Sequence, residues 1–424
     1  MIRKYINPSS ILQNKIIMSD KNNLIEIFLA GVDRVLGYNA VKKFLDESPI
    51  TGDLNLVSIG KAGSSMALAA LEHPNIKIKS GLVITKRNHL EVGLEKYTKT
   101  VKCLESDHPT PSLTSLECGT DLIKFINSKQ PDDEFLFLLS GGGSSLVENI
   151  VEGFSLEELM NLTDALLSRG YNINDINAIR KHFSQIKGGK LASFLKSRKT
   201  TVLTISDVPF DDPKVIASGP LSYDDAKINL DNYEDDITDK IKSIRPISCP
   251  DISMFSNINT KIIAKLDDAK FACKSYGEKL NYETYLNENF IEGDVNSLAN
   301  YFSEYLENCQ KGLHIWGGES SVNLPEKPGR GGRNQQLALL MAEKIRNKDI
   351  VFLSAGTDGT DGPTNDAGGI VDGNTINKGN ECKLDYKKFI KNADSGNYHE
   401  KTNSLVTTGP TGTNVMDLIL AIKK

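Results

Sequence analysis

Short apolar runs alternate with amphipathic stretches along the first half of the chain. Five runs have the length and the β-branched or aromatic composition of buried strands: residues 54–60, 81–86, 100–106, 135–140 and 201–206. Apolar residues at spacings of three and four predict helices around them: residues 24–36, 61–73, 111–128, 156–169 and 176–194. Strands that alternate with helices predict a doubly wound parallel sheet, with the helix over 24–36 covering it.

The same alternation continues after an acidic, interrupted segment over 222–240, which we interpret as a connecting region. Further strands are predicted at residues 261–266, 282–287, 314–316, 350–356 and 404–409, and a closing helix at 414–423. We place a domain boundary in the acidic segment, which divides the chain into residues 1–225 and 226–424.

Length and charge narrow the class of protein. A chain of 424 residues exceeds what one hydrophobic core usually serves, so two domains with a cleft between them are expected. The net charge of -5 argues against a broad nucleic-acid surface, and local lysines and arginines are therefore expected to bind small anions.

Cysteine usage and the N-terminal residues predict a protein of the reducing cytoplasm. None of the six cysteines belongs to a C-x-x-C pair or to a zinc-type spacing. The first residues lack the continuous apolar stretch of a signal peptide, and no segment approaches the ~20 apolar residues of a membrane-spanning helix.

Glycine-rich or aspartate-rich loops accompany the predicted strands. They lie at residues 58–66, 138–146, 205–213, 315–320, 329–340, 354–369 and 408–414. Open α/β sheets gather their ligand contacts at the carboxyl ends of the strands, so we expect a ligand site assembled from several of these loops.

Lys61 follows a strand and Gly60 at the start of a helix, so its ammonium can reach an anion held by the same backbone amides. The segment is not a Walker loop, because Asn55 stands where that pattern needs glycine and Ala62 where it needs serine or threonine. A solvated lysine in the first helical turn is an equally good interpretation.

A second glycine loop follows a very apolar strand. In it, Gly141, Gly142 and Gly143 are followed by Ser144 and Ser145. This composition favours a backbone nest around phosphate oxygens, although a tight strand-to-helix turn explains it as well. The G-x-S-x-G pattern of acyl-transfer nucleophiles fails, because its last glycine is absent.

A basic cluster stands out in this acidic chain. Arg180, His182, Lys187 and Lys190 surround a pair of glycines that let the chain turn sharply. A pocket for a carboxylate or phosphate is one interpretation, and a solvated helix face is the other.

Two sets of aspartates follow predicted strands: Asp207, Asp211 and Asp212, and later Asp358, Asp361 and Asp366. Mg²⁺ takes such oxygen ligands, few in number and shared with phosphate, but ordinary Asp-Gly turns explain aspartates too. Basic and acidic loops in one chain favour phosphoryl transfer, which needs cations around the transferring group and a carboxylate near the nucleophile or metal.

The loop GRGGRN places Arg330 and Arg333 beside Gly331 and Gly332, just before a helix that includes Asn334. Glycine lets a backbone approach a ligand closely, a helix N-terminus attracts anions, and arginine offers a planar fork for phosphate or carboxylate. An ordinary turn before a surface helix is the alternative.

Nine segments, taken in order, resemble type II glycerate kinases of the MOFRL class, whose members are also labelled hydroxypyruvate reductases. The segments are GKA (60–62), HPTP (108–111), SGGGSS (140–145), RKHFSQIKGGKLA (180–192), SDVPFDDPKVIASGP (206–220), GGES (317–320), GRGGRNQQLAL (329–339), AGTDGTDGPTNDAGG (355–369) and TGPTGTNVMDL (408–418). The chain departs from the family at Ser112 and Ser145, where aspartate and alanine are common.

The resemblance implies a larger Rossmann-like N-terminal domain and a smaller C-terminal α/β domain with a MOFRL-like core at about 312–424, the active site lying in the cleft. It implies that Lys61 stabilises charge at the transferring phosphoryl, that Asp207 activates a metal or hydroxyl, and that Arg333 clamps an anion. Members often begin near Met18, which marks the preceding residues as an extension of no catalytic importance.

We therefore expect ATP- and Mg²⁺-dependent phosphorylation of D-glycerate, with 2-phosphoglycerate favoured over 3-phosphoglycerate as the product. An NAD(P)H-dependent hydroxypyruvate reductase is less well supported, because no G-x-G-x-x-G follows the first strand of either half. A non-catalytic sensor would need the anion loops without a metal site. The expected partners are D-glycerate and ATP, without nucleic acid or membrane, and a homo-oligomer stays open.

These expectations assign the remaining contacts. The predicted substrate-binding residues are Arg180, His182, Lys187, Ser144 and Ser145. The predicted nucleotide- and phosphate-binding residues are Gly60, Gly141, Gly142, Gly143, Gly331, Gly332, Asn334, Thr357 and Asp358. The predicted metal ligands are Asp207 and Asp358.

Overall fold

The computed structural model describes residues 19–245 and 247–424, so the predicted N-terminal extension lies outside the described residues. The chain forms two compact units. The N-terminal unit is Gly37–Ile263, and the C-terminal unit combines residues 264–424 with the described residues up to Leu36. Within the described residues, no helix is both long enough and apolar enough to span a membrane.

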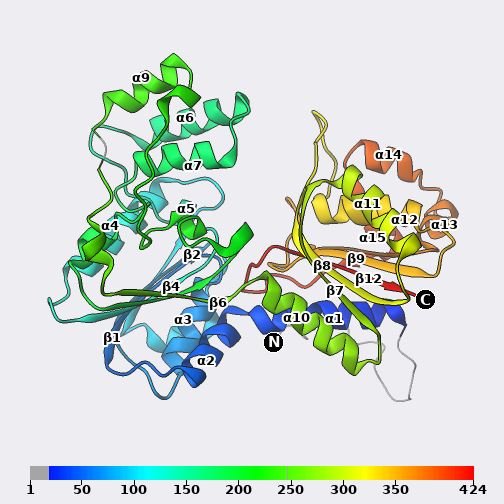
Figure 1. Ribbon diagram of the computed structural model, residues 1–424, viewed down its shortest axis with the longest axis horizontal. Coiled ribbons are helices and arrows are strands. Elements are labelled where there is room, and N and C mark those ends of the chain that lie inside the picture. The colour runs from blue at the N-terminus through cyan, green and yellow to red at the C-terminus, as the bar shows by residue number, and fades with distance from the viewer. Residues whose placement is uncertain (1–18, 246) are drawn as a thin grey trace. The chain divides into compact units, whose positions relative to one another are not determined.

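The N-terminal unit is built on one sheet with the strand order β3-β2-β1-β4-β5-β6 (Figure 1). Its strands are β1 (Asp53–Ile59), β2 (Lys77–Lys86), β3 (Val101–Ser106), β4 (Glu134–Leu139), β5 (Thr200–Ile205) and β6 (Ile258–Ala264). The first five pair in parallel throughout. The predicted strands and the parallel sheet of the first half are therefore confirmed.

Six of the eight helices that the structure describes in this unit contribute to one of two hydrophobic cores. The eight helices are α2 (Gly37–Glu47), α3 (Gly63–Glu72), α4 (Leu113–Asn127), α5 (Gly143–Leu146), α6 (Leu156–Ser168), α7 (Ile173–His182), α8 (Ala192–Leu195) and α9 (Asp235–Ser243). Leu122 and Ile126 of α4 pack with strand residues such as Phe137 in the core beside the sheet. A smaller core joins α6, α7 and α9, which Figure 1 shows grouped away from the sheet.

One predicted helix is shorter than expected. The prediction of a helix over 176–194 was wrong in its second half, because α7 ends at His182. Gly188 and Gly189 follow with φ of 58° and 78°, a left-handed conformation that glycine adopts easily and that interrupts a helix. The segment 183–190 is therefore a folded turn rather than a helix.

The division of the chain differs from the boundary predicted at 225/226. Ile237 and Ile241 of α9 are buried in the small core of the N-terminal unit, so the acidic segment folds with that unit. The strand predicted at 261–266 corresponds to β6, which extends the first sheet next to β5. Hydrophobic burial and strand pairing thus keep the chain in the first unit up to Ile263.

The C-terminal unit has a mixed sheet with the order β11-β10-β9-β12-β8-β7. Its strands are β7 (Thr284–Asp294), β8 (Gly312–Ser321), β9 (Ile350–Gly356), β10 (Gly368–Asp372), β11 (Leu405–Val406) and β12 (Asp417–Lys423). Only β7 and β8 pair in parallel among the ladders of these strands, and the others are antiparallel. The covering helices are α10 (Leu266–Lys279), α11 (Val295–Asn308), α12 (Arg333–Lys344), α13 (Thr375–Glu381), α14 (Tyr386–Lys391) and α15 (Ser395–Thr402).

The predicted closing helix at 414–423 was wrong, because these residues supply the central strand β12. This strand pairs with β8 on one side and β9 on the other, and its apolar side chains are almost fully buried. A short, continuous apolar run has no period that separates a buried strand from a buried helix, so the sequence pattern alone could not decide.

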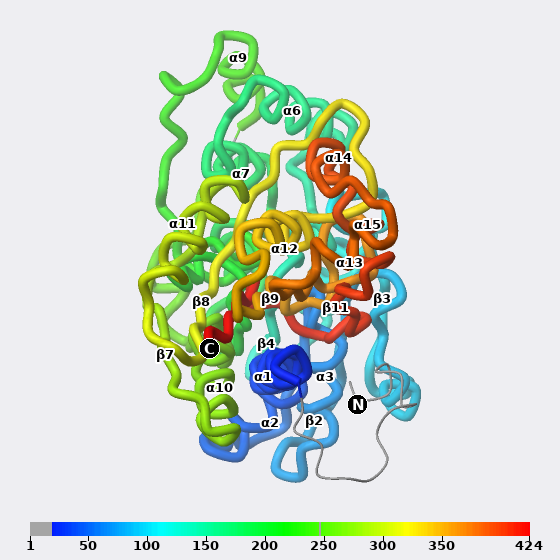
Figure 2. The backbone as a smooth tube through the Cα atoms, turned by 90° about the vertical axis from the view of Figure 1, so that its right-hand side faces the viewer, coloured from blue at the N-terminus to red at the C-terminus, as the bar shows by residue number. Residues whose placement is uncertain are grey.

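Helix α1 (Asp20–Val35) belongs to the C-terminal unit, so the prediction that it covers the first sheet was wrong. Figures 1 and 2 show it alongside α10, and it also contacts β9 and β12. Leu24, Phe28 and Val32 are fully buried on that side. Gly31 allows the close approach, because a Cβ there would press on the Cys273 sulfur.

Candidate active site

In the N-terminal unit, the loops that follow β1 and β4 are bonded to each other. Lys61 N donates to the Gly141 carbonyl (2.9 Å), and Ala62 N donates to Ser140 Oγ (3.0 Å). Gly60 has a φ of 132°, and a Cβ at this position would overlap Ser140. The glycines at these strand ends therefore allow two loops to close onto each other at the carboxyl edge of the sheet.

Asp207 joins the same place from the end of β5. A Cβ at Gly141 would overlap the Asp207 carboxylate, which means that this side chain packs directly on the glycine backbone. Lys61 packs on the next glycine, since a Cβ at Gly142 would lie 3.1 Å from Lys61 Cγ. The structure thus brings Lys61, Asp207 and the glycine run together within one unit.

His108 lies at this site and was not among the predicted residues. A Cβ at Gly142 would lie 3.0 Å from His108 Cδ2 and 3.2 Å from its Nε2. The signal was present in the sequence, because the HPTP segment directly follows the strand β3. The neighbouring Asp107 accepts hydrogen bonds from Ser112 and Arg87, which order the loop.

The two serines of the glycine loop have different surroundings. Ser145 Oγ donates to the Gly142 carbonyl (3.1 Å) and is buried, so its hydroxyl completes the turn. Ser144 Oγ instead accepts a hydrogen bond from Ser218 Oγ (2.8 Å). Ala217 and Ser218 have φ of 51° and 63°, and such left-handed non-glycine residues are typical of functional loops.

The basic cluster is not one exposed patch. Lys187 is buried and forms an ion pair with Glu148, and burial lowers the pKa of its ammonium. Lys190 donates to the carbonyls of Lys181 (2.6 Å) and Ser184 (2.7 Å), and burial lowers its pKa to about 8. These two lysines therefore fix the turn after α7. The ammonium group of Lys187 is buried in this ion pair and is not exposed for the substrate contact that the sequence predicted.

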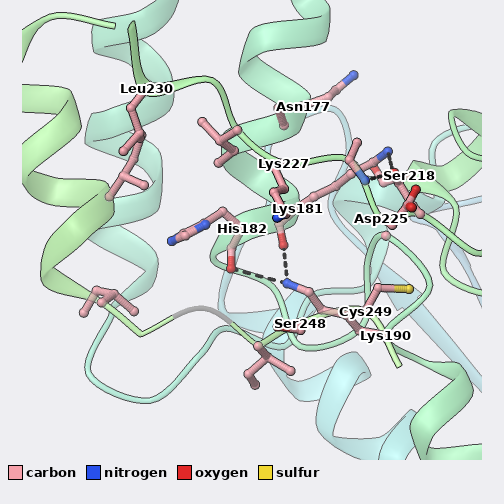
Figure 3. A pocket seen from close by; sticks show the side chains of 18 of the residues that line it. Asn177, Lys181, His182, Lys190, Ser218, Asp225, Lys227, Leu230, Ser248 and Cys249 are labelled. Carbon is pink, nitrogen blue, oxygen red and sulfur yellow. Dashed lines mark hydrogen bonds and ion pairs between the residues drawn. The ribbon is translucent and has the colours of Figure 1, made fainter. Parts of the chain in front are cut away.

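His182 lines a cavity of 1130 Å³ between α7, α9 and the segment that precedes α9 (Figure 3). Burial lowers the pKa of its imidazole, which favours the neutral ring. Lys190 and Ser218 line the same cavity. Arg180, two residues before His182 in α7, makes no hydrogen bond through its guanidinium to any residue that the structure describes.

In the C-terminal unit, the N-terminus of α12 is already occupied by a carboxyl group of the chain, that of Asp361. Its carboxylate accepts hydrogen bonds from Asn334 N (3.1 Å) and Gln335 N (2.8 Å), and a Cβ at Gly332 would overlap it. Burial raises the pKa of Asp361 to about 7. This arrangement differs from the predicted phosphate site at Gly331, Gly332 and Asn334.

Arg333 lies between two carboxylates. Its Nε and Nη2 donate to the two oxygens of Asp417 (2.8 and 3.2 Å), and its Nη1 lies 2.6 Å from Glu319. Burial acts to lower the pKa of this guanidinium, but Asp417 and Glu319 outweigh it and raise the pKa. Arg330 has separate partners, Asp366 (2.6 Å) and Glu400 (2.9 Å).

Thr357 and Asp358 follow β9 at the same end of the second sheet. The buried Thr357 hydroxyl donates to the Met416 carbonyl (2.6 Å) and accepts from Val415 N, so it holds the loop before β12. Asp358 accepts two hydrogen bonds from Thr360 (3.0 Å each). A Cβ at Gly356 would lie 3.3 Å from Asp358 Oδ1 and 3.4 Å from Asp417 Oδ1, so both carboxylates flank this glycine.

Asp417 was missed as a site residue, although it stands in the last of the resembling segments. Its importance follows from pairing with Arg333, which sequence spacing does not reveal. Among the residues that the structure describes, no three His, Cys, Asp or Glu side chains are grouped to hold a metal ion.

Comparison with known proteins places this architecture in a family. Residues 23–242 match a domain of unknown function, DUF4147, and residues 312–417 match the MOFRL family. D-glycerate 2-kinase of Thermotoga maritima is 35% identical over 416 residues, which cover 95% of this chain and 98% of that protein. Glycerate 2-kinase of Pyrococcus horikoshii is 34% identical over 399 residues, covering 89% and 88%.

A solved structure agrees with these matches. The crystal structure of glycerate kinase from Thermotoga maritima superposes with a TM-score of 0.84 at 34% identity, covering 96% of this chain and 100% of that one. This similarity extends over nearly the full length of both chains and therefore includes both units. The chain belongs to the glycerate 2-kinase family, in which a DUF4147 domain is followed by a MOFRL domain.

Proposed function

We propose that this protein transfers the γ-phosphoryl group of ATP to the 2-hydroxyl of D-glycerate and releases 2-phosphoglycerate and ADP. The observation that carries the proposal is the meeting of Lys61 and Asp207 on the Gly141–Gly142 backbone. A cation, a carboxylate and close-packed glycine amides are the groups that phosphoryl transfer uses. The names of the relatives support the substrate.

Lys61 and Asp207 take complementary roles in this proposal. The Lys61 ammonium stabilises negative charge on the phosphoryl oxygens as the group moves, which lowers the barrier because the charge is already in place. Asp207 accepts the proton of the attacking hydroxyl or holds Mg²⁺ beside it. His108, against the same glycine, is close enough to contribute to binding or to proton transfer.

Arg333 acts in this proposal as a fixed source of positive charge. A guanidinium has five N–H donors, and Asp417 and Glu319 engage three of them. The two others can bind a phosphate or carboxylate oxygen while the fork to Asp417 holds the group in its plane. This role differs from the predicted clamp, in which the fork itself would grip the ligand.

Mg²⁺ enters with the nucleotide in this proposal, and Asp207 is the carboxylate of the N-terminal unit assigned to it; Asp358, the other predicted ligand, belongs to the C-terminal unit. The donor set fits, because Mg²⁺ commonly binds through one or two protein carboxylates and substrate phosphates. The ion would neutralise phosphate charge during transfer. We also propose that the protein works in the cytoplasm, because its six cysteines form no disulfide and this agrees with a reducing compartment.

Product analysis tests the function. The purified protein should consume ATP only with D-glycerate and Mg²⁺, and ³¹P–¹H correlation NMR should place the new phosphate on carbon 2. Phosphate on carbon 3 would overturn the regiochemistry alone. Oxidation of NADH or NADPH with hydroxypyruvate, without ATP turnover, would favour the reductase and overturn the kinase.

A further inference from the structure

The segment that follows β5 is fastened to the glycine loop at both of its ends. At its start, the Asp207 carboxylate packs on Gly141, because a Cβ on this glycine would overlap it. At its end, Ala217 packs on Gly143, since a Cβ there would lie 2.9 Å from the Ala217 Cβ. Residues 207–217, which we call the β5 loop, are therefore held against the glycine loop at two points.

Hydrogen bonds inside the β5 loop fix its second half. The Asp212 carbonyl accepts from Val215 N (2.9 Å), and the Asp212 carboxylate accepts from Lys214 N (2.9 Å). These bonds make a compact turn that begins at Asp212. The chain between Asp207 and Asp212 is therefore a short bridge between two fixed points.

Phe210 stands in the middle of this bridge, in a backbone conformation that is unfavourable for it. Its φ is 63° and that of Asp211 is 56°, so two successive non-glycine residues are left-handed. A bulky residue seldom has a positive φ, and such strain persists where the surrounding structure enforces it, commonly at ligand sites. Burial does not compensate the strain, because Phe210 is 94% exposed. The β5 loop thus presents an aromatic ring to solvent beside the glycine loop.

The ring of Phe210 suits only one of the two substrates in the proposed function. Glycerate carries hydroxyl and carboxylate groups and has no flat apolar face, whereas the adenine of ATP is a π-system on which an aromatic ring stacks. The reach is suitable as well, because three residues of chain span at most about 10 Å from Asp207 and the side chain extends further. In ATP, the ribose and the other two phosphates separate the base from the reacting phosphoryl by a comparable length.

We propose that the adenine ring of ATP stacks on Phe210 while the triphosphate lies at the glycine loop. The inference rests on the proposed function and extends it to the nucleotide base. Stacking uses the face of the base and none of its hydrogen-bonding groups, so this contact holds guanine as well as adenine. The alternative is that Phe210 is an exposed side chain of the loop that touches no ligand.

Calorimetric titrations with ADP and with inorganic tripolyphosphate, both in the presence of Mg²⁺, test the contact without turnover. Phe210→Gly should weaken ADP binding about tenfold and leave tripolyphosphate binding within twofold of the wild type, because tripolyphosphate has no base to stack. Phe210→Tyr keeps the ring and should keep the ADP affinity within twofold. Equal ADP affinity in the wild type and Phe210→Gly would overturn the proposal. Equal weakening of both probes would also overturn it, because the loss would then lie at the phosphates.

Steady-state kinetics give a second readout. Phe210→Gly should raise KM for ATP and for GTP about tenfold and change KM for D-glycerate less than twofold. An equal rise in the glycerate KM would indicate a general disturbance of the loop and would refute the assignment. If the wild type does not turn over glycerate, the proposed function fails, and the ADP titration still decides whether Phe210 binds the base. If the wild type is active, a normal KM for ATP in Phe210→Gly removes the base contact alone.

Lys196→Gly is the matched control for the change of backbone. Lys196 is exposed at the end of α8 and has a φ of 50°, so glycine relieves a comparable strain there. Both glycine variants should keep Tm at or above the wild-type value, because glycine adopts a left-handed conformation without steric cost. Lys196→Gly should leave ADP binding and both KM values within twofold of the wild type. A Tm that falls only in Phe210→Gly would assign the ring to the fold and contradict the base contact.

Discussion

Arg333 and Asp417 form a two-pronged ion pair that joins the first residue of α12 to the first residue of β12. Asp417 is nearly inaccessible, and its strand lies at the centre of the second sheet. The guanidinium plane is therefore fixed by a rigid element rather than by its own flexible chain. A fixed plane is what a lysine at this position could not reproduce.

The first prediction concerns this fork. Arg333→Lys should lower kcat/KM for glycerate nearly as much as Arg333→Ala, because neither variant pairs with both oxygens of Asp417. Both variants should also unfold more easily. Removing one partner of a buried ion pair commonly costs about 3–5 kcal/mol of unfolding free energy, and we expect roughly half of that cost here because Arg333 is partly exposed. Steady-state kinetics and thermal unfolding measure the two effects.

Arg330→Ala is the control for the fork. Arg330 pairs with Asp366 and Glu400 and has no contact with Asp417 in the structure described, so its loss should loosen the loop but lower kcat/KM less than Arg333→Ala. A kcat/KM of Arg333→Lys within about threefold of the wild type, under ~0.7 kcal/mol, would contradict the fork argument.

Lys61→Ala should lower kcat by roughly a hundredfold or more, because one preorganised charge at a developing transition state is commonly worth ~3 kcal/mol. The fold should survive, since the variant keeps the backbone N–H of Lys61 that closes the loop onto the Gly141 carbonyl. Circular dichroism checks the fold and initial rates check kcat. Wild-type turnover in the folded variant would remove Lys61 from the mechanism.

Asp207→Asn keeps the size of the side chain that packs on Gly141 and removes its charge. Turnover should fall far more than the affinity for either substrate if Asp207 acts in the chemical step. A titration with Mg²⁺ distinguishes its two roles: recovery at high Mg²⁺ indicates coordination, and no recovery indicates proton transfer. An unchanged rate would exclude both.

Asp361 predicts a pH dependence of stability. Its pKa is about 7 in the folded protein and 3.8 without that environment, so between these values the folded state keeps a proton that the unfolded state has released. The stabilisation that this group contributes is therefore fully present below about pH 4, is lost as the pH rises from there to about 7, and does not change further above that pH. The decline is about 4 kcal/mol at most.

Asp361→Asn removes this titration. Urea unfolding of the wild type and the variant between pH 5 and 8 should show the difference in unfolding free energy moving in favour of the variant as pH rises. Asp366→Asn, which changes a neighbouring carboxylate with a different partner, is the comparison. A difference that does not vary with pH would contradict the raised pKa.

The first sheet could be predicted because each of its strands is a short apolar run bounded by a loop. Lys61 and Asp207 could be placed together because they follow β1 and β5, and the strands of a parallel sheet end at the same edge. β12 and α1 could not be placed, because an apolar run does not say which sheet or helix covers it. Only the folded structure shows that Leu418 lies in the central strand β12 and that Phe28 is buried in the C-terminal unit.

Ligand contacts were harder to predict than strand ends. Glycines at α12 and the cations after α7 looked like anion sites, but internal carboxylates fill both positions: Asp361 at the helix, and Glu148 at Lys187. A sequence shows which charges are present but not which of them pair across the fold. Asp417 was missed for the same reason, whereas His108 stands in a segment whose place after β3 could have pointed to it.

The place of α1 in the C-terminal unit bears on the order in which the chain folds during synthesis. The apolar face of α1 is buried against α10 and against β12, the latter made almost four hundred residues later. The N-terminal unit is continuous and can fold as soon as its last strand leaves the ribosome, whereas α1 can meet α10 only after that unit has been made and β12 only when translation is almost complete. The first helix to be made is thus among the last to be buried, and a chain released early would expose it to chaperones and proteases.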